Sequence, residues 1–572
     1  MTEIHPDLAD RLARALAAAG ATALFGLPGG GPNLDVVGAA QRHGLRFVLA
    51  HAETPAAIMA GTFGLLTGAP APVVVTRGPG AASVANGLAQ ATLDRFPLVV
   101  VADTVPRAAA HGVAHQRLDQ PALLGPAAKV SATIADGMAD DDLRALVGAA
   151  ARWPYGGVHL DFDPTADLTT DGAADGAAEP CDVVPAEAAE VDKVRAGEAL
   201  ERVVAARRPV LVVGMEAAAL PAGPELVAAL AAALGCPVLT TYQAVGVVPT
   251  EGPANAGLFT NGALEAPVLA AADLIVTVGL DLVEPIPAPW PYPAPVVRLS
   301  AVAQTDDYLP AAVDVVGDLA ASLHSLVDGL AATAPTADWP ADAAVRFRDD
   351  ARQVLRADPG AGTDDGEPGA RTEPARPGSA DAGVGRLGPV ELVETVARHA
   401  PPGLTVTVDA GAHFLAVLPL WPVDGPHRLL ISNGLATMGF ALPAAIGAAL
   451  ARPGQPVLAL TGDGGLSMVL GELETVARLD LPVTVIVFND AALSLIEIKQ
   501  RPHHGGPGAV RYRPTDFAAI ARASGLDAVT VTTPAELAAA VAHADGWQRG
   551  PRLVDARVDP APYRHLIAAT RG

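Results

Sequence analysis

Short apolar runs recur along the whole chain, and helix-like segments lie between them. The runs at 73–75, 210–213 and 457–461 read VVV, VLVV and VLALT. Strands that are apolar on both faces are typical of parallel sheets covered by helices, and parallel strands need helical crossovers to connect them. The alternation therefore predicts an α/β fold built from doubly wound parallel sheets.

The alternation is interrupted twice, by stretches at 166–190 and 357–385 that are poor in large apolar residues. A chain of 572 residues is also too long for one hydrophobic core. We therefore predict three domains, at 1–165, 191–345 and 386–572. The stretch at 357–385 is rich in Pro, Gly and acidic residues, which predicts a flexible linker.

The composition limits the partners that the chain can have. Its net charge is −24, from 38 basic and 62 acidic residues, which argues against a nucleic-acid or anionic-membrane surface. No apolar run is long enough to span a bilayer, and the N-terminus lacks the basic start of a signal peptide. Cys181 and Cys236 make neither a disulfide framework nor a zinc motif. We expect a cytoplasmic protein that binds small molecules and neither nucleic acid nor membrane.

The run at 457–461 ends in one carboxylate among glycines, Gly462-Asp463-Gly464-Gly465, and Asp490 follows the next predicted strand. The carboxyl ends of parallel strands meet at one sheet edge, so the two carboxylates are expected to converge. Hard oxygen ligands suit Mg²⁺, and a glycine-rich turn suits a phosphate. The alternative is a turn in which Asp463 caps the next helix. No Gly-Lys-Ser/Thr follows, so the turn is not a P-loop.

This pattern, Gly462-Asp463-Gly464 and then Asn489-Asp490, resembles the metal motif of the thiamine-diphosphate enzymes. The rest of the chain is similar to their acetolactate synthase branch, near pyruvate oxidases, decarboxylases and benzaldehyde lyase. The resemblance implies pyrimidine-binding, central and diphosphate-binding domains, in that order. It also implies that Asp463, Asp490 and the carbonyl of Ala492 hold Mg²⁺, while Gly464 and Gly465 face the diphosphate. Many members carry Asn where this chain has Asp490.

Glu53 follows a predicted strand in the segment RFVLAHAETPAAIMAG. Taken alone, it could be an ordinary acid at a helix N-terminus. The flanking segments ALFGLPGG and TRGPGAASVANGLAQATLDRFPLVVVAD, however, are similar to the family's pyrimidine-binding domain. In the family, a buried Glu there hydrogen-bonds the pyrimidine ring and promotes loss of the thiazolium C2 proton. The resemblance implies this catalytic role for Glu53.

Further cofactor contacts follow from the resemblance in both outer domains. The diphosphate would be gripped by the stretch VDAGAHF, and the bent cofactor would be supported by SNGLATMGFALPAAIG. His413 could instead be a loop histidine, and Met438 could be part of the core. The residues implied are Gly29, Pro79, Gly411, His413, Ala436 (through its carbonyl) and Met438.

Candidate substrate residues come from two further stretches. His115 and Gln116 lie where acetolactate synthases carry Phe-Gln-Glu and 2-keto acid decarboxylases carry His-His, which implies catalytic roles; a structural role for His115 is the alternative. Leu495 and Ile496 would line an acceptor pocket. Glu497 would be a further acid/base or a solvated helix acid. Gly30 is also expected to line the substrate pocket.

The resemblance implies a carboligase that decarboxylates a small 2-keto acid such as pyruvate and adds the two-carbon unit to an acceptor carbonyl. Lys499 stands about where biosynthetic acetohydroxyacid synthases carry a Trp, which argues against branched-chain biosynthesis. Decarboxylation alone, aldehyde lysis and a specialised acceptor stay open, and a catalytically silent cofactor-binding subunit is the alternative from another class. Aldehydes are therefore also candidate substrates.

The resemblance also implies cofactors and an oligomeric state. Thiamine diphosphate and Mg²⁺ are expected. FAD is bound by the central domain of some relatives, and no stretch of 191–345 decides the matter; we expect none. In the family, the catalytic Glu and the metal site meet across a subunit interface, so a homodimer or a homotetramer is implied.

Overall fold

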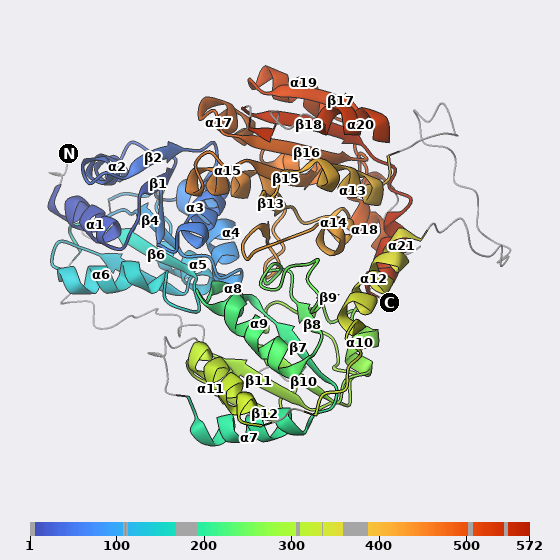
Figure 1. Ribbon diagram of the computed structural model, residues 1–572. Helices are drawn as coiled ribbons and strands as arrows, with labels where there is room; N and C mark the ends of the chain where they lie inside the picture. Colours follow the sequence, from blue (N-terminus) through green and yellow to red (C-terminus); the bar gives the residue numbers. More distant parts are fainter. Residues whose placement is uncertain are drawn as a thin grey trace.

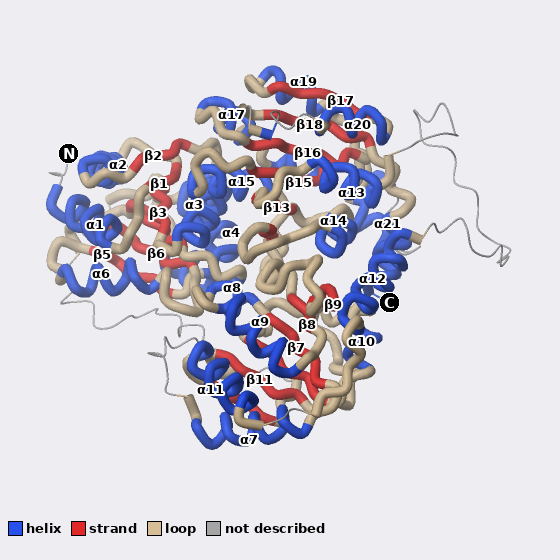
Figure 2. The backbone as a smooth tube through the Cα atoms, in the orientation of Figure 1, coloured by secondary structure: helices blue, strands red, loops and turns tan. Residues whose placement is uncertain are grey.

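The computed structural model describes residues 6–106, 109, 112–166, 191–304, 309–333, 336–357, 387–500, 507–542, 547–548 and 550–571. The described residues form three six-stranded sheets with only parallel strand pairs (Figures 1 and 2). The predicted α/β class with three doubly wound domains is thus confirmed, while the exact domain limits stay predictions. The linker predicted at 357–385 lies outside the described residues, except for Ala357. No helix in the described ranges is long and apolar enough to cross a membrane.

The N-terminal sheet has the strand order β2-β1-β3-β4-β6-β5. Its alternating side chains point to two cores, since Val74 packs with α1, α2 and α6 while Val73 and Val75 pack with α3 and α4. Its strands are β1 (Ala23–Gly26), β2 (Arg46–Leu49), β3 (Ala71–Val75), β4 (Leu98–Asp103), β5 (Val130–Ile134) and β6 (Gly157–Phe162). Its helices are α1 (Pro6–Ala18), α2 (Asn33–Arg42), α3 (Glu53–Thr67), α4 (Pro79–Leu93), α5 (Gln120–Leu124) and α6 (Asp140–Ala149).

The C-terminal sheet has the corresponding order, β14-β13-β15-β16-β18-β17. Its strands are β13 (Thr405–Val408), β14 (Leu429–Ile431), β15 (Val457–Gly462), β16 (Val483–Asn489), β17 (Asp527–Val531) and β18 (Arg552–Arg557). Its helices are α13 (Pro389–His399), α14 (Phe414–Leu420), α15 (Ala441–Ala451), α16 (Asp463–Met468), α17 (Glu472–Arg478), α18 (Ser494–Lys499), α19 (Phe517–Ala523), α20 (Pro534–Val541) and α21 (Tyr563–Arg571).

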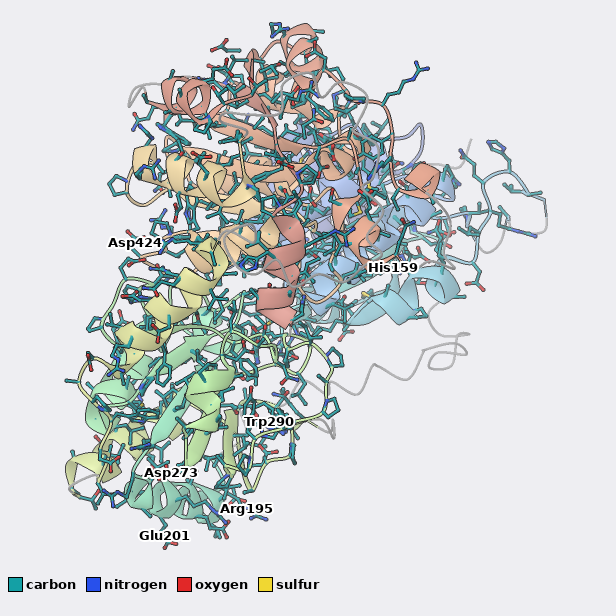
Figure 3. All side chains as sticks on the ribbon, turned by 90° about the vertical axis from the view of Figure 1, so that its right-hand side faces the viewer. His159, Arg195, Glu201, Asp273, Trp290 and Asp424 are labelled. Atoms are coloured by element: carbon teal, nitrogen blue, oxygen red, sulfur yellow. The ribbon has the colours of Figure 1, made fainter. Side chains whose placement is uncertain are left out.

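The central sheet has a different order, β12-β11-β10-β7-β8-β9. Its strands are β7 (Pro209–Val213), β8 (Val238–Thr240), β9 (Asn255–Leu258), β10 (Leu274–Val278), β11 (Val296–Ser300) and β12 (Val313–Val316). Its helices are α7 (Lys193–Ala205), α8 (Met215–Ala219), α9 (Gly223–Leu234), α10 (Ala266–Ala270), α11 (Leu319–Ala331) and α12 (Ala343–Arg356). Figure 3 shows Arg195 and Glu201 of α7 at the far end of this domain, away from the other two.

The N- and C-terminal domains share one hydrophobic core. Helix α3 packs against α15, and residues of both helices and both sheets belong to the same buried cluster. The approach is close, because a Cβ added at Gly447 would lie 2.4 Å from the carbonyl oxygen of Met59. Small residues on both helices permit this distance, as the alanine-rich sequence of α15 shows. The two domains therefore form one rigid layered body, with the central domain beside it (Figure 1).

Candidate active site

A cavity of about 410 Å³ lies at the carboxyl ends of β13, β15 and β16, where the ligands of open parallel sheets bind. Tyr242 and Ile286 of the central domain and Arg571 of α21 also line it. Most of the C-terminal residues predicted from the sequence are brought together here, namely Gly411, His413, Ala436, Met438, Asp463, Gly464, Gly465, Asp490, Ala492, Leu495 and Ile496.

Asp463 is buried at the first position of α16, and its carboxylate is fixed by hydrogen bonds. Oδ1 accepts from the N–H of Gly464 (2.7 Å), and Oδ2 accepts from the N–H groups of Asp490 (3.2 Å) and Ala491 (2.6 Å). Burial raises the pKa of Asp463, and these hydrogen bonds act in the opposite direction. The Asp490 carboxylate accepts from the N–H of Ala492 (3.2 Å) and from the Ser494 hydroxyl. The two acids therefore lie at one turn, as the spacing predicts.

This turn suits a hard cation held by few protein ligands. The described residues contain no group of three or more His, Cys, Asp or Glu side chains that could hold a metal ion. A cation here would depend on Asp463, Asp490, a backbone carbonyl such as that of Ala492, and oxygens of a bound ligand. Mg²⁺ is commonly bound in this way, through one or two carboxylates together with phosphate oxygens. The donor set therefore fits Mg²⁺ with a diphosphate.

His413 carries a buried polar atom that faces no protein partner. Its Nε2 has no hydrogen bond within the described structure, and its ring stacks on Phe488 with 5.1 Å between ring centroids. Burial lowers the pKa of His413 to about 4, so its imidazole is neutral at pH 7 without a ligand. A neutral imidazole that lines the cavity beside the glycine turn can donate an N–H to a phosphate oxygen.

Two residues of this site were missed by sequence reasoning. Asp409 is fully buried and accepts from the N–H groups of Gly439 (2.9 Å) and Phe440 (3.2 Å) and from the Thr461 hydroxyl (2.9 Å). Tyr512 donates its hydroxyl to Asp463 Oδ1 at 2.6 Å. Asp409 could have been found from the sequence, because it directly follows strand β13 inside the stretch VDAGAHF. Tyr512 lies in a loop, and no sequence pattern marks it as a site residue.

The N-terminal candidates form a second cluster around the start of α4. A Cβ added at Gly80, next to Pro79, would lie 3.4 Å from Glu53 Oε1, and one at Gly78 would lie 2.6 Å from the Gln116 carbonyl oxygen. The N–H of Gly29 donates to Asn33 Oδ1 at 3.0 Å, and the Asn33 amide donates to Asp103 Oδ1 at 2.9 Å. These residues thus share one neighbourhood.

The two clusters are not brought together within this chain. No described residue of the N-terminal domain lines the 410 Å³ cavity. His115, Gln116 and Gly30 are exposed. Glu497 does not line the cavity either, because its carboxylate pairs with Arg511, with 2.6 Å between Oε1 and Nε.

The central sheet has the strand order typical of dinucleotide-binding domains, whose ligand lies between the strands that correspond to β7 and β10. Here the Glu284 carboxylate fills that point. It accepts from the N–H groups of Met215 and Asp281, each at 3.0 Å, and from the Thr241 hydroxyl. Burial raises the pKa of Glu284 to about 8. The N–H group of Met215, at the start of α8, is thus already paired at this point.

Comparisons with known proteins agree with this arrangement. Three models of thiamine pyrophosphate enzymes match the chain: the N-terminal TPP binding domain at residues 6–123, the central domain at 196–326 and the C-terminal TPP binding domain at 409–556. The chain is 29% identical to an acetolactate synthase of Bacillus subtilis, over 94% of this chain and 91% of the relative. It is also 29% identical to a catabolic acetolactate synthase of Raoultella terrigena, with 90% and 89% covered. A probable 2-ketoarginine decarboxylase of Pseudomonas aeruginosa is 29% identical as well, with 90% and 87% covered.

Proposed function

This chain belongs to the thiamine pyrophosphate enzymes, and from that premise we propose that it is a carboligase acting on a small 2-keto acid, with pyruvate as the donor to test first. The bond between C1 and C2 of the keto acid breaks and CO₂ leaves. A new carbon–carbon bond forms to an acceptor carbonyl, whose oxygen takes up a proton. The observation that carries the proposal is the cavity in which Asp463, Asp490 and His413 converge.

Thiamine diphosphate, when bound, supplies a nucleophilic carbon and an electron sink. Asp463, Asp490 and the carbonyl of Ala492 would hold Mg²⁺, and Gly464, Gly465 and His413 would face the diphosphate. The carbonyl of Ala436 would accept from the aminopyrimidine, and Met438 would support the bent cofactor. Leu495 and Ile496 would make the acceptor side of the cavity apolar.

The proton chemistry is assigned to the N-terminal domain. Glu53 would hold a proton at the pyrimidine ring, with Pro79 and Gly29 beside it, and Gln116 and His115 would reach the substrate. Since no described residue of this domain lines the cavity of its own chain, the site would be completed by a partner subunit. A homodimer is the smallest assembly that provides both halves, and a homotetramer would provide them too.

A second candidate is a 2-keto acid decarboxylase without ligation. Its support is the similarity over most of the chain to the probable 2-ketoarginine decarboxylase, together with His115, which would act as a proton relay. Aldehyde lysis and ligation to a specialised acceptor use the same cofactor chemistry and are outcomes of the same test.

The test incubates the purified protein with pyruvate, Mg²⁺ and thiamine diphosphate, and follows pyruvate loss and products. Acetolactate would support the carboligase, and acetaldehyde alone would support the decarboxylase. Cofactor binding without pyruvate loss would exclude pyruvate as sole donor and acceptor. Other keto acids, aldehydes and paired acceptors would then be tested.

A further inference from the structure

One wall of the candidate active site is held in place by a residue of another domain. Loop 432–438 joins β14 to the segment before α15, and Ser432, Asn433, Ala436 and Met438 of this loop line the cavity. On its other side the loop meets Asp94, which directly follows α4 of the N-terminal domain and is 2% exposed.

The Asp94 carboxylate accepts four hydrogen bonds, three of them from this loop. Oδ1 accepts from the N–H groups of Asn433 (3.0 Å) and Gly434 (2.6 Å), and Oδ2 accepts from the Ser432 hydroxyl (2.6 Å). The fourth comes from the Gln90 side chain, whose Nε2 lies 2.9 Å from Oδ2. Four donors converge on this one carboxyl group, and three of them belong to residues 432–434, so Asp94 fixes the start of the loop.

Further hydrogen bonds connect Asp94 to the part of the loop that carries the predicted cofactor contacts. The Ser432 hydroxyl oxygen also accepts from the N–H of Thr437 at 3.2 Å, and the Thr437 hydroxyl donates to Asn86 of α4 at 3.0 Å. Thr437 lies between the two predicted cofactor contacts, Ala436 and Met438. Ala436 has φ +55°, a left-handed conformation that a non-glycine residue keeps only when its surroundings impose it.

The packing leaves the loop no freedom at this point. A Cβ added at Gly434 would lie 2.6 Å from the carbonyl oxygen of Leu93, the last residue of α4. Beyond Met438, the loop is fixed inside its own domain by Asp409. The loop thus has a buried carboxylate at each end, one of them in the N-terminal domain, and the Asn433 amide donates to the Glu284 backbone carbonyl of the central domain at 2.8 Å.

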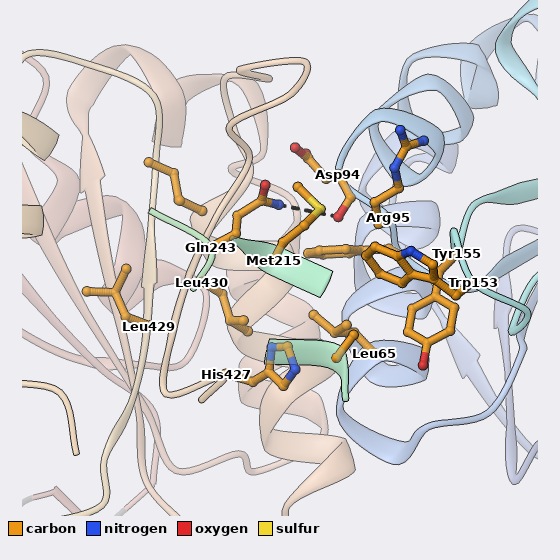
Figure 4. A pocket seen from close by; sticks show the side chains of 13 residues that line it. Leu65, Asp94, Arg95, Trp153, Tyr155, Met215, Gln243, His427, Leu429 and Leu430 are labelled. Atoms are coloured by element: carbon orange, nitrogen blue, oxygen red, sulfur yellow. Dashed lines mark hydrogen bonds between the residues drawn. The ribbon is translucent and has the colours of Figure 1, made fainter. Parts of the chain in front are cut away.

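Figure 4 shows Asp94 at the junction of the three domains, where the Gln243 side chain of the central domain donates to the Asp94 backbone carbonyl at 3.3 Å. The cavity beside it is about 20 Å³, which is room for a water molecule but not for an organic ligand. Asp94 therefore serves the loop and not a ligand of its own. The next residue, Arg95, joins the domains through an ion pair with Asp281 (2.7 Å), and its described hydrogen bonds go to Asp281 and Thr92 and not to the loop.

We propose that Asp94 is a positioning residue for the thiamine diphosphate site. Through Ser432 it holds the Ala436 carbonyl and Met438 where the cofactor needs them, so cofactor affinity depends on a residue that does not touch the cofactor. This inference rests on the proposed function of the cavity.

The experiment measures the Kd of thiamine diphosphate for the full chain by calorimetry at saturating Mg²⁺, together with the thermal midpoint of the cofactor-free protein. Asp94→Ala removes every acceptor and is expected to raise the Kd at least tenfold. Asp94→Asn should raise it only about threefold, because the amide keeps one acceptor and Gln90, whose Oε1 is unpaired, can reorient to match it. Ser432→Ala, which removes one of the four hydrogen bonds to Asp94 together with the relay to Thr437, should fall between the two.

The matched control is Arg95→Met, which removes the neighbouring interdomain ion pair. It should lower the thermal midpoint and leave the Kd within twofold. If Asp94→Asn and Ser432→Ala also lower the thermal midpoint without changing the Kd, Asp94 merely joins the domains and the inference is wrong. These two variants decide the question even if the Asp94→Ala protein does not fold. If the unsubstituted protein binds no thiamine diphosphate, the proposed function fails first.

Discussion

At the residue scale, Glu53 is the side chain on which the proposed chemistry most depends. It is the first residue of α3, where any acid is favoured by the helix dipole, so its position has a purely structural explanation as well. The residues around Glu53, however, favour a catalytic role as well. The carboxylate lies near Gly80 at the start of α4, next to Pro79, which is a predicted cofactor contact.

Glu53→Gln is expected to lower kcat at least about 100-fold, since general acid–base groups contribute roughly 10²–10⁴-fold, and to change the Kd of thiamine diphosphate by less than about fivefold. Steady-state kinetics on the substrate found above, with calorimetry for the cofactor, measures both. Asp142→Asn is the matched control, because Asp142 is also an acid in a first helical turn but is exposed on α6. If turnover survives in Glu53→Gln, the dipole explanation is sufficient and the mechanism is wrong.

Individual residues could be predicted where a short motif surrounds them. Asp463, Asp490 and His413 follow strand ends in recognisable stretches, and the structure gathers them around one cavity. Asp409 and Asp94 could not be assigned, because their roles consist of hydrogen bonds to a loop that lies 30 or more residues away in the sequence. Such roles depend on tertiary contacts that local sequence does not contain.

At the scale of elements, the alternation of strands and helices predicted the fold class, but the strand orders had to come from the structure. The N- and C-terminal sheets share one order, β2-β1-β3-β4-β6-β5 and β14-β13-β15-β16-β18-β17, which is consistent with duplication of one domain. Crossover direction and strand insertion depend on packing of the whole sheet, so periodicity alone could not reveal this likeness.

The central sheet has the strand order of dinucleotide-binding domains, but Glu284 occupies the point between β7 and β10 where such a ligand would bind. We therefore predict that the protein contains no flavin. The purified protein should show no flavin absorption bands and release no flavin on denaturation, since Glu284 is paired with Met215 where a pyrophosphate would bind. Absorption spectra of the native and the heat-denatured protein check this. Stoichiometric flavin would mean that Glu284 moves aside on binding.

The same carboxylate makes stability depend on pH. Burial disfavours the charged form of Glu284 and raises its pKa from the ordinary 4.5 to about 8 in the folded protein. The folded state then binds more protons, so stability is full below about pH 4.5 and falls as pH rises to about 8, by at most roughly 5 kcal/mol. Glu284→Gln should therefore flatten the fall of the urea midpoint between pH 5 and pH 8.

The control for this measurement is Glu251→Gln. The pKa of Glu251 is lowered by its hydrogen bond to Arg352, so its contribution changes only below its ordinary range and leaves the profile between pH 5 and pH 8 unaltered. A Glu284→Gln protein with the slope of the unsubstituted protein would mean that Glu284 stays ionised when buried.

At the scale of the whole molecule, the shared core of the N- and C-terminal domains fixes two half-sites in one rigid body without joining them. Under the proposed function, the half with Glu53 and the half with Asp463 would then meet between subunits. A two-fold dimer would place each half against the complementary half of its partner and form two complete sites.

Mixed dimers test this arrangement directly. In a dimer of one Glu53→Gln chain and one Asp463→Asn chain, one site would carry both substitutions and the other neither. Random pairing makes about half of the dimers mixed, so co-expression of the two inactive variants should restore about one quarter of the unsubstituted activity. Asp463→Asn with Asp490→Asn is the matched control, because both substitutions lie in the same half and no mixed dimer contains an intact site. If mixed dimers isolated with two affinity tags stay inactive, each site is built from a single chain and the N-terminal cluster has another role.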